Sequence, residues 1–338
     1  MIANEKLLKA VEQGLITDEA RALINEYNDR LLSNNVPIIY NLRHLRKLLK
    51  IKKSDQPLLF GNKRKEAYKT FYIPKKSGSE RKIEAPIDQL KNIQYWIKKN
   101  IIEKFNVSEY ATGFKRHISI YHNALSHVGK ELVINLDLKD FFPSIKYRDI
   151  FRIFNYIGYT NEVSHLLTKL CINSENVLPQ GSPVSPILSN IVCLKLDKRL
   201  GKLSEKFNCS YSRYADDITF SGGNGIKNIL PLVKQIIEEE SFVINEKKVR
   251  LQYSFQRQEV TGLIVNHKVA APKKIISEIE KAIYYCKKYD VVSHMQKIKC
   301  DKAFYKEHLY GIAYFIKMID VELGKSYLCG LDQIAWIY

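Results

Sequence analysis

The feature that most constrains this 338-residue sequence is a pair of adjacent carboxylates, Asp216 and Asp217, set between two short apolar segments. The flanking sequences, YSRY before Ala215 and ITF after Asp217, are typical of strands and predict a tight hairpin with both aspartates at its turn. Adjacent carboxylates in such a place repel each other unless a cation neutralises them, so a metal ion is the economical explanation. A solvated turn is the alternative, and it is the more common origin of an isolated Asp–Asp pair.

A third acidic residue, Asp137, closes the segment Glu131 to Leu138, whose pattern ELVINLDL predicts a strand. A carboxylate at the end of an apolar strand is costly if it is buried and unpaired. If Asp137 lies beside Asp216, oxygen ligands from two strands can bridge two Mg²⁺ ions at a separation of about 3.5 to 4 Å. One ion would lower the pKa of an attacking hydroxyl and the other would stabilise a pyrophosphate leaving group. We therefore predict that Asp137, Asp216 and Asp217 are metal ligands and catalytic residues.

The composition indicates a polyanionic partner. Lys and Arg number 54 against 36 Asp and Glu, which gives a net charge of +18 and favours nucleic acid through phosphate contacts, although an unspecialised basic protein is the alternative. The sequence has neither a run of about 18 apolar residues nor a signal peptide, so we predict a cytoplasmic protein with no membrane partner. None of the six cysteines has the short spacing of a zinc site, and we predict reduced thiols.

The remaining patterns predict a mixed α+β core followed by a helical region. A basic-tipped hairpin is expected from Ala67 to Pro86. After His267 to Pro272, a basic amphipathic helix could face a duplex, or could be an ordinary solvated helix. Further helices are expected in the first 50 residues with a break at Pro37, at Asp88 to about Lys104, 147 to 171, Pro186 to about Lys206 and Ile226 to Glu240, and further strands at Ser241 to Ile244 and Glu259 to Val265.

Together these segments resemble the reverse transcriptase family. YADD is similar to its palm hairpin motif, and INLDLKDFFPSI is similar to its first palm strand, with Asp137 as the metal aspartate. LPQGSPVSPILSN resembles the motif that supports the incoming nucleotide and the template. The resemblance implies that Gln180 and Gly181 lie against that base pair, although LPQGSP alone is also a common loop followed by a helix.

Three further segments resemble motifs of the same family. FYIPKKSGSERKIEAP is similar to the fingers hairpin, which implies that Lys75, or its neighbour Lys76, and Arg81 contact the triphosphate. Phe142 matches the bulky residue that excludes a ribose 2′-OH. FVINEKK resembles the motif whose lysine, here Lys248, protonates pyrophosphate. Alone, each segment has an ordinary interpretation, such as a solvated hairpin tip or a core aromatic, and their common order favours the family. Ser241 and Phe242 depart from the family pattern, since many relatives have Gly there.

Two short motifs resemble those of retron reverse transcriptases. NALSH, with Asn123 and His127, is similar to the NAxxH motif, and Val260, Thr261 and Gly262 are similar to the VTG motif. The resemblance implies that these residues bind RNA. A packing histidine and a strand with a glycine bulge are the alternatives. Retron enzymes bind a structured noncoding RNA encoded beside them, prime from a guanosine 2′-OH and make branched RNA-linked DNA.

We therefore expect an α+β right-hand polymerase: an N-terminal helical segment at 1–50, fingers and an antiparallel-sheet palm at 51–266, and a helical thumb at 267–338. The predicted function is RNA-directed DNA polymerisation on a cognate noncoding RNA, with two Mg²⁺ ions and deoxynucleoside triphosphates. Family resemblance also implies an RNA–DNA product, antiphage defence and a separate effector protein. The alternatives are another bacterial reverse transcriptase, of group II intron-like or abortive-infection type, and a non-catalytic RNA-binding scaffold. No endonuclease or maturase extension is seen, which favours the retron expectation.

Overall fold

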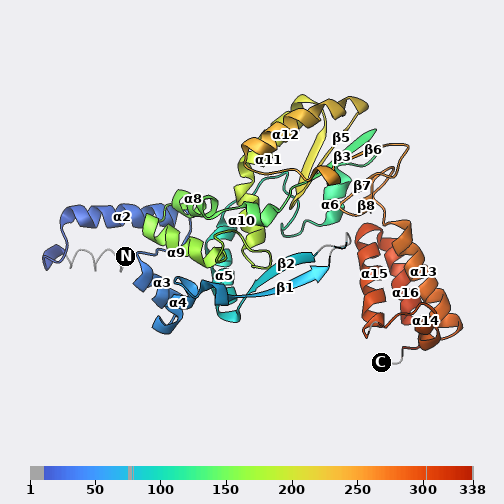
Figure 1. The fold of residues 1–338 in the computed structure, drawn as a ribbon, viewed down its shortest axis with the longest axis horizontal. Coiled ribbons are helices and arrows are strands. Elements are labelled where there is room, and N and C mark those ends of the chain that lie inside the picture. The colour runs from blue at the N-terminus through green and yellow to red at the C-terminus, as the bar shows by residue number, and fades with distance from the viewer. Residues whose placement is uncertain (1–10, 75–77, 79, 302, 337–338) are drawn as a thin grey trace. The chain divides into compact units, whose positions relative to one another are not determined.

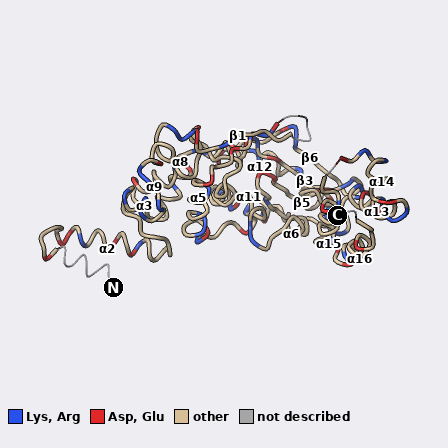
Figure 2. Tube along the Cα trace, turned by 90° about the horizontal axis from the view of Figure 1, so that it is seen from below, with Lys and Arg blue, Asp and Glu red and all other residues tan. Residues whose placement is uncertain are grey.

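The computed structural model describes residues 11–74, 78, 80–301 and 303–336, and the chain divides into two units of interleaved segments. The first unit comprises Met1–Glu109, Lys139–Lys198 and Ile237–Val243, and the second comprises Tyr110–Leu138, Arg199–Ile236 and Ile244–Tyr338. Lys and Arg residues occur throughout both units, with Asp and Glu among them (Figure 2). Lys75 and Lys76, predicted at the triphosphate, lie outside the described residues.

The first unit is mainly helical. Its first described helices, α2 (Asp18–Ser33) and α3 (Leu42–Leu48), lie on either side of Pro37, as predicted, and the Tyr27 hydroxyl donates to the Ile39 carbonyl between them. The predicted 147 to 171 helix is two helices, because Gly158 adopts φ +112° between them. The helices of this unit after α3 are η1 (Lys53–Asp55), α4 (Gln56–Leu59), η2 (Arg64–Ala67), α5 (Asp88–Asn100), η3 (Ile102–Lys104), α7 (Phe141–Ser144), α8 (Tyr147–Ile157), α9 (Asn161–Cys171) and α10 (Ser185–Val192).

The two strands of the predicted hairpin are present in this unit, and the lysines predicted at its tip lie outside the described residues. Strands β1 (Tyr68–Pro74) and β2 (Glu80–Pro86) pair antiparallel, with Ile73 opposite Arg81. The Glu84 amide donates to the Gln180 carbonyl at 2.8 Å, so the hairpin is held to the LPQG loop by the backbone.

The second unit contains a four-stranded antiparallel sheet (Figure 1). Its strand order is β4 (Ser210–Tyr214), β5 (Asp217–Gly222), β3 (Leu132–Asp137) and β6 (Arg250–Tyr253). β3 is central and every one of its residues is buried, which explains its nearly continuous apolar sequence. Two short helices contact the sheet. α6 (Ile120–Leu125) contacts β4, and η4 (Asn224–Ile229) contacts β3 and β5. The longer helices α11 (Leu194–Lys206) and α12 (Leu230–Glu239) and the short η5 (Glu246–Lys248) complete this part of the chain.

Two strand predictions need correction. Ser241 to Ile244 is not a strand: Ile244 alone forms a bridge, with Leu138, because Ser241 adopts φ +66° where the chain leaves α12. Instead β6, which was not predicted, pairs with β3 a few residues later. The predicted segment Glu259 to Val265 is a small hairpin of β7 (Glu259–Val260) and β8 (Leu263–Ile264), whose turn residues Thr261 and Gly262 both have positive φ. It is therefore a two-residue turn rather than a strand with a bulge.

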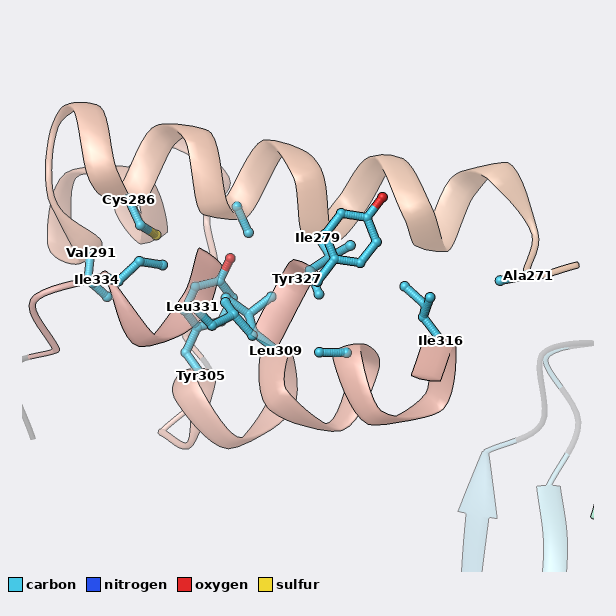
Figure 3. Packing of buried hydrophobic residues seen from close by; sticks show 12 residues of the cluster. Ala271, Ile279, Cys286, Val291, Tyr305, Leu309, Ile316, Tyr327, Leu331 and Ile334 are labelled. Carbon is cyan, nitrogen blue, oxygen red and sulfur yellow. The ribbon is translucent and has the colours of Figure 1, made fainter. Parts of the chain in front are cut away.

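The C-terminal part of the second unit is a helical bundle with its own apolar core. It comprises α13 (Lys273–Lys288), α14 (Val291–Lys297), α15 (Tyr305–Ile319) and α16 (Val321–Asp332). Figure 3 shows Ile279, Leu309, Ile316 and Leu331 pointing into the space between the helices. The predicted stripe of α13 is confirmed, since Ile279 and Cys286 are buried in this core. The helices and antiparallel sheet together confirm the α+β class.

Candidate active site

The three predicted aspartates meet at one end of the sheet. β3 and β5 pair in a register that sets Asp137 directly opposite Asp217. The Leu138 amide donates to the Asp216 carbonyl at 3.0 Å, which fixes the hairpin turn against the end of β3. Asp216 lies in the turn, whereas Asp217 is the first residue of β5 and not, as predicted, part of the turn. Carboxylates from two separate stretches of chain therefore converge, as the sequence predicts.

The turn is held in an unusual backbone conformation. Ala215 adopts φ +59°, which is unfavourable for a residue with a Cβ atom, and the Arg213 guanidinium donates to its carbonyl at 3.0 Å. The segment before helix α6 lies alongside, where the Thr112 amide donates to the Arg213 carbonyl. A Cβ atom at Gly113 would come within 2.8 Å of the Ala215 nitrogen. Gly113 is therefore required for this close approach of two backbones.

Lys248 forms an ion pair with Asp137 at this site. Its Nζ lies 2.8 Å from Asp137 Oδ2, and Asn245 Nδ2 lies 3.4 Å from Oδ1. Asp217 keeps some exposure to solvent, but partial desolvation by the neighbouring protein raises the pKa of its carboxyl to about 6, and repulsion from Asp216 and Asp137 adds to this shift. The site therefore carries more negative charge than Lys248 neutralises.

These residues have the chemistry of divalent-cation ligands, although their side chains are not arranged as a closed coordination site. Within the described part of the chain, no group of three or more His, Cys, Asp and Glu side chains is placed to hold a metal ion. The oxygen donors of Asp137, Asp216 and Asp217 are of the kind that Mg²⁺ prefers, and a cation would relieve the repulsion that raises the Asp217 pKa.

The residues predicted at the nucleotide lie in the first unit. Gly181 has φ +132°, and a Cβ atom there would come within 2.9 Å of the Glu84 carbonyl oxygen, so the LPQG loop requires glycine at this position. Gln180 and Phe142 are half-buried, and the Phe142 ring lies 5.3 Å from that of Phe141. Arg81 is exposed on β2.

Comparison with known proteins decides the family. Residues 73–304 match the family model described as reverse transcriptase (RNA-dependent DNA polymerase). The retron Ec86 reverse transcriptase of Escherichia coli is 33% identical over 315 residues, covering 91% of this chain and 94% of that protein. This chain belongs to the reverse transcriptase family.

A second retron enzyme agrees with this assignment. The retron Mx162 reverse transcriptase of Myxococcus xanthus is 32% identical, over 79% of this chain and 61% of that protein. Among solved structures, telomerase from Candida albicans aligns with a TM-score of 0.45 and 11% identity, over 79% of this chain and 63% of that one, which is too distant to add to the assignment.

The retron-type assignment and the right-hand polymerase fold expected from the sequence are thus confirmed, and the protein is an RNA-directed DNA polymerase. No helix among the described residues is long and apolar enough to cross a membrane. All six cysteines are free thiols, as predicted.

The retron-like motifs of this reverse transcriptase are mostly inside the protein. Asn123, His127 and Val260 are buried, whereas Gly262 is exposed at the β7–β8 turn and Thr261 is half-buried beside it. The two polar side chains of the NAxxH motif make internal hydrogen bonds, so the surface that this region offers to a ligand is the turn rather than Asn123 or His127.

Sequence reasoning missed the hydroxyl residues that bind these two motif residues. Ser212 and Ser221, on β4 and β5, both contact His127, and Thr112 donates to Asn123 Oδ1 at 2.7 Å. The strands carried no clear signal, because Ser212 and Ser221 alternate with the apolar Tyr211 and Phe220 and so lie on the opposite face, which the pattern alone would leave to solvent.

Proposed function

We propose that this reverse transcriptase copies a cognate structured noncoding RNA, starting from a guanosine 2′-OH, and leaves the DNA joined to that RNA through a branch. The relatives named as retron enzymes and the NAxxH and VTG motifs support this proposal. The observation that carries the polymerase chemistry is the register of Asp137 opposite Asp217, which gathers carboxylates where a hydroxyl and a triphosphate would react.

In the proposed site, Asp137, Asp216 and Asp217 would hold two Mg²⁺ ions. When bound, such ions activate the attacking hydroxyl and neutralise the charge on the triphosphate. The carboxylates would orient the reacting groups, and the β3–β5 register sets Asp137 opposite Asp217. Lys248, whose ammonium group already lies at the site, would give a proton to the departing pyrophosphate.

We propose that the nucleotide is bound by residues of the first unit. Arg81 and Lys75 would contact the triphosphate, and Gln180 and Gly181 would lie against the new base pair. The exposed Arg81 guanidinium suits phosphate, and a glycine at 181 allows close approach of the backbone. Phe142 would exclude a ribose 2′-OH by steric clash.

The proposed division of the chain is an N-terminal helical segment at 1–50, fingers and palm at 51–266, and a thumb at 267–338. In support, a continuous bundle core begins at Ala271, and the sheet with the aspartates lies before it. We also propose that the turn at Thr261 and Gly262 contacts RNA, with Asn123, His127 and Val260 behind it. Two further proposals are a cytoplasmic location and a role in antiphage defence with a separate effector protein.

The catalytic assignment is tested with Asp137→Asn. Loss of one of the three carboxylates that would hold the ions should lower DNA synthesis on an RNA template by about a thousandfold, while the thermal midpoint changes little. Asp140→Asn is the matched control, because Asp140 is exposed, lies three residues later and has φ +47°, which Asn tolerates. Equal activity of Asp137→Asn and the parent would refute the site.

The retron proposal is tested by sequencing nucleic acid that copurifies with the protein. A branched species with a 2′,5′ linkage between RNA and DNA is the expected result. Unbranched DNA alone would favour another bacterial reverse transcriptase, and RNA without any DNA product would favour a non-catalytic scaffold.

A further inference from the structure

A buried polar network lies behind the aspartate-bearing hairpin. His127, which has no exposed surface, lies with Nε2 2.7 Å from the Ser212 hydroxyl and Nδ1 2.6 Å from the Ser221 hydroxyl. Ser212 belongs to β4 and Ser221 to β5, so one imidazole ring bridges both strands of the hairpin. Such short contacts within a dry interior are strong and directional.

Asn123 extends this network to two other segments. Its Oδ1 accepts from the Ser212 hydroxyl and from the Thr112 hydroxyl, both at 2.7 Å. Its Nδ2 donates to the Thr261 hydroxyl at 3.3 Å, in the turn between β7 and β8. Thr112 is also bound to the backbone of Arg213, within the hairpin itself. The network therefore joins helix α6, the hairpin and the β7–β8 turn.

The network and the aspartates share one face of the sheet. Pairs opposite each other in an antiparallel sheet point to the same side. Ser212 is opposite Thr219, and Thr219 is opposite Asn135, two residues before Asp137. Ser221 is four residues after Asp217 on that same face, at a distance of about 13 Å along the strand. The hydrogen bonds therefore act on the strands that carry the carboxylates, without touching the carboxylates.

We propose that Asn123, His127, Ser212 and Ser221 are positioning residues for polymerisation, which hold the aspartate-bearing hairpin in register with the β7–β8 turn. The inference rests on the proposed catalytic role of Asp137, Asp216 and Asp217. β4 pairs along its length with β5, whereas on its other side Arg213 forms an isolated bridge with Ala111, so side-chain hydrogen bonds from outside the sheet have a share in fixing its twist. A catalytic group displaced by about 1 Å can cost a hundredfold in rate.

His127 is a positioning residue rather than a proton carrier. Burial lowers the pKa of its imidazole to about 3, so the ring is neutral in the ordinary pH range, with one nitrogen donating and the other accepting. Two hydroxyl partners satisfy both nitrogens. A ring with both nitrogens occupied and no exposed surface does not reach substrate.

The test is a double-mutant cycle between the two ends of the network. Ser212→Ala and Thr261→Val each remove one hydroxyl, and valine keeps the branched Cβ of Thr261 in its backbone conformation of φ +46°. Steady-state rates are measured on an RNA template with an annealed DNA primer, well below the thermal midpoint of every variant. We expect Ser212→Ala to lower kcat about tenfold with the KM for deoxynucleotide nearly unchanged, and Thr261→Val to lower kcat several-fold. The kcat of the double variant should be about tenfold below that of the parent, as for Ser212→Ala alone, because both changes break the same connection.

Thr168→Val provides the matched control. Thr168 is fully buried in α9 of the first unit, and its hydroxyl donates to the Ser164 carbonyl at 2.7 Å. It should lower the thermal midpoint about as much as Ser212→Ala while kcat stays within twofold of the parent. If Ser212→Ala fails to fold, His127→Gln, which retains a donor and an acceptor, takes its place in the cycle.

The positioning role is overturned if Ser212→Ala and Thr168→Val have the same kcat, or if the losses in the double variant multiply. That outcome differs from failure of the proposed catalytic site, which would appear as activity retained by Asp137→Asn. If Asp137→Asn loses activity while Ser212→Ala does not, the proposed function stands and the positioning role of the network is rejected.

Discussion

Lys248 and a divalent cation would compete for the same carboxylate oxygen. The Lys248 ammonium group lies 2.8 Å from Asp137 Oδ2, on a side chain that is 59% exposed. An exposed partner makes this a weak ion pair, and its removal should strengthen metal binding by about two- to fivefold. We expect Lys248→Met to lower the Kd for Mn²⁺, followed by electron paramagnetic resonance, while the rate of DNA synthesis falls.

Lys247→Met is the control for this competition, since it removes the same charge from the preceding, exposed position. It should leave Mn²⁺ affinity unchanged within a factor of two. If Lys248→Met does not tighten Mn²⁺ binding, or if both variants tighten it equally, the lysine does not compete for Asp137.

His127 should make the fold sensitive to acid. Its pKa is about 3 in the folded protein and about 6.5 in the unfolded chain, so the unfolded state binds the additional proton below pH 6.5. The free energy of unfolding should therefore decrease as pH falls, by about 2 kcal/mol between pH 7 and pH 5 from this group. His127→Gln cannot take up this proton, and its urea-derived free energy should vary less with pH by that amount. Parallel pH profiles for the two proteins would contradict the buried neutral imidazole.

Among the secondary-structure elements, the end of α12 shows how a departure from the family pattern is accommodated. Ser241 adopts φ +66°, its amide donates to the Glu238 carbonyl, and the Phe242 amide donates to the Ile237 carbonyl. This is the hydrogen-bond pattern of a Schellman motif, in which the left-handed residue is usually glycine. Ser241 therefore provides a left-handed turn residue in place of glycine, and Lys248 still reaches Asp137.

Ser241→Gly should consequently stabilise the protein. Relief of the left-handed conformation is worth about 1 kcal/mol, partly offset by the greater freedom of glycine in the unfolded chain, so we expect a gain of about 0.5 kcal/mol in urea unfolding. Ser241→Ala retains the Cβ atom and should not gain stability. A loss of stability in Ser241→Gly would show that the serine is not strained.

The elements that were predicted correctly have strong local signals. Apolar strands flank Ala215 to Asp217, and ELVINLDL becomes the buried central strand, so the sequence shows where the carboxylates converge. Strand β6 was missed because it lies at a sheet edge and its residues are at most half-buried, which weakens the alternation that marks a strand. The register of β3 with β5 and the partners of His127 depend on contacts 80 to 94 residues apart, which no local pattern specifies.

At the scale of the whole molecule, the net charge of +18 should dominate affinity for nucleic acid. For about six phosphate contacts, the affinity for an RNA–DNA duplex should fall by about a thousandfold between 50 and 200 mM salt. Fluorescence anisotropy measures this dependence, and a duplex with uncharged methylphosphonate linkages serves as the control. Binding to the natural duplex that does not change with salt would argue against a phosphate-driven interaction.

The order of the strands in the sheet also has a consequence for synthesis of the protein. β3, which carries Asp137, lies between β5 and β6, and these arrive about 80 and 115 residues later in the chain. A nascent polypeptide that has emerged only through Asp137 holds one member of the carboxylate cluster and neither neighbouring strand. The ribosome must therefore release most of the chain before a polymerising centre can form, so incomplete products cannot copy the RNA around them.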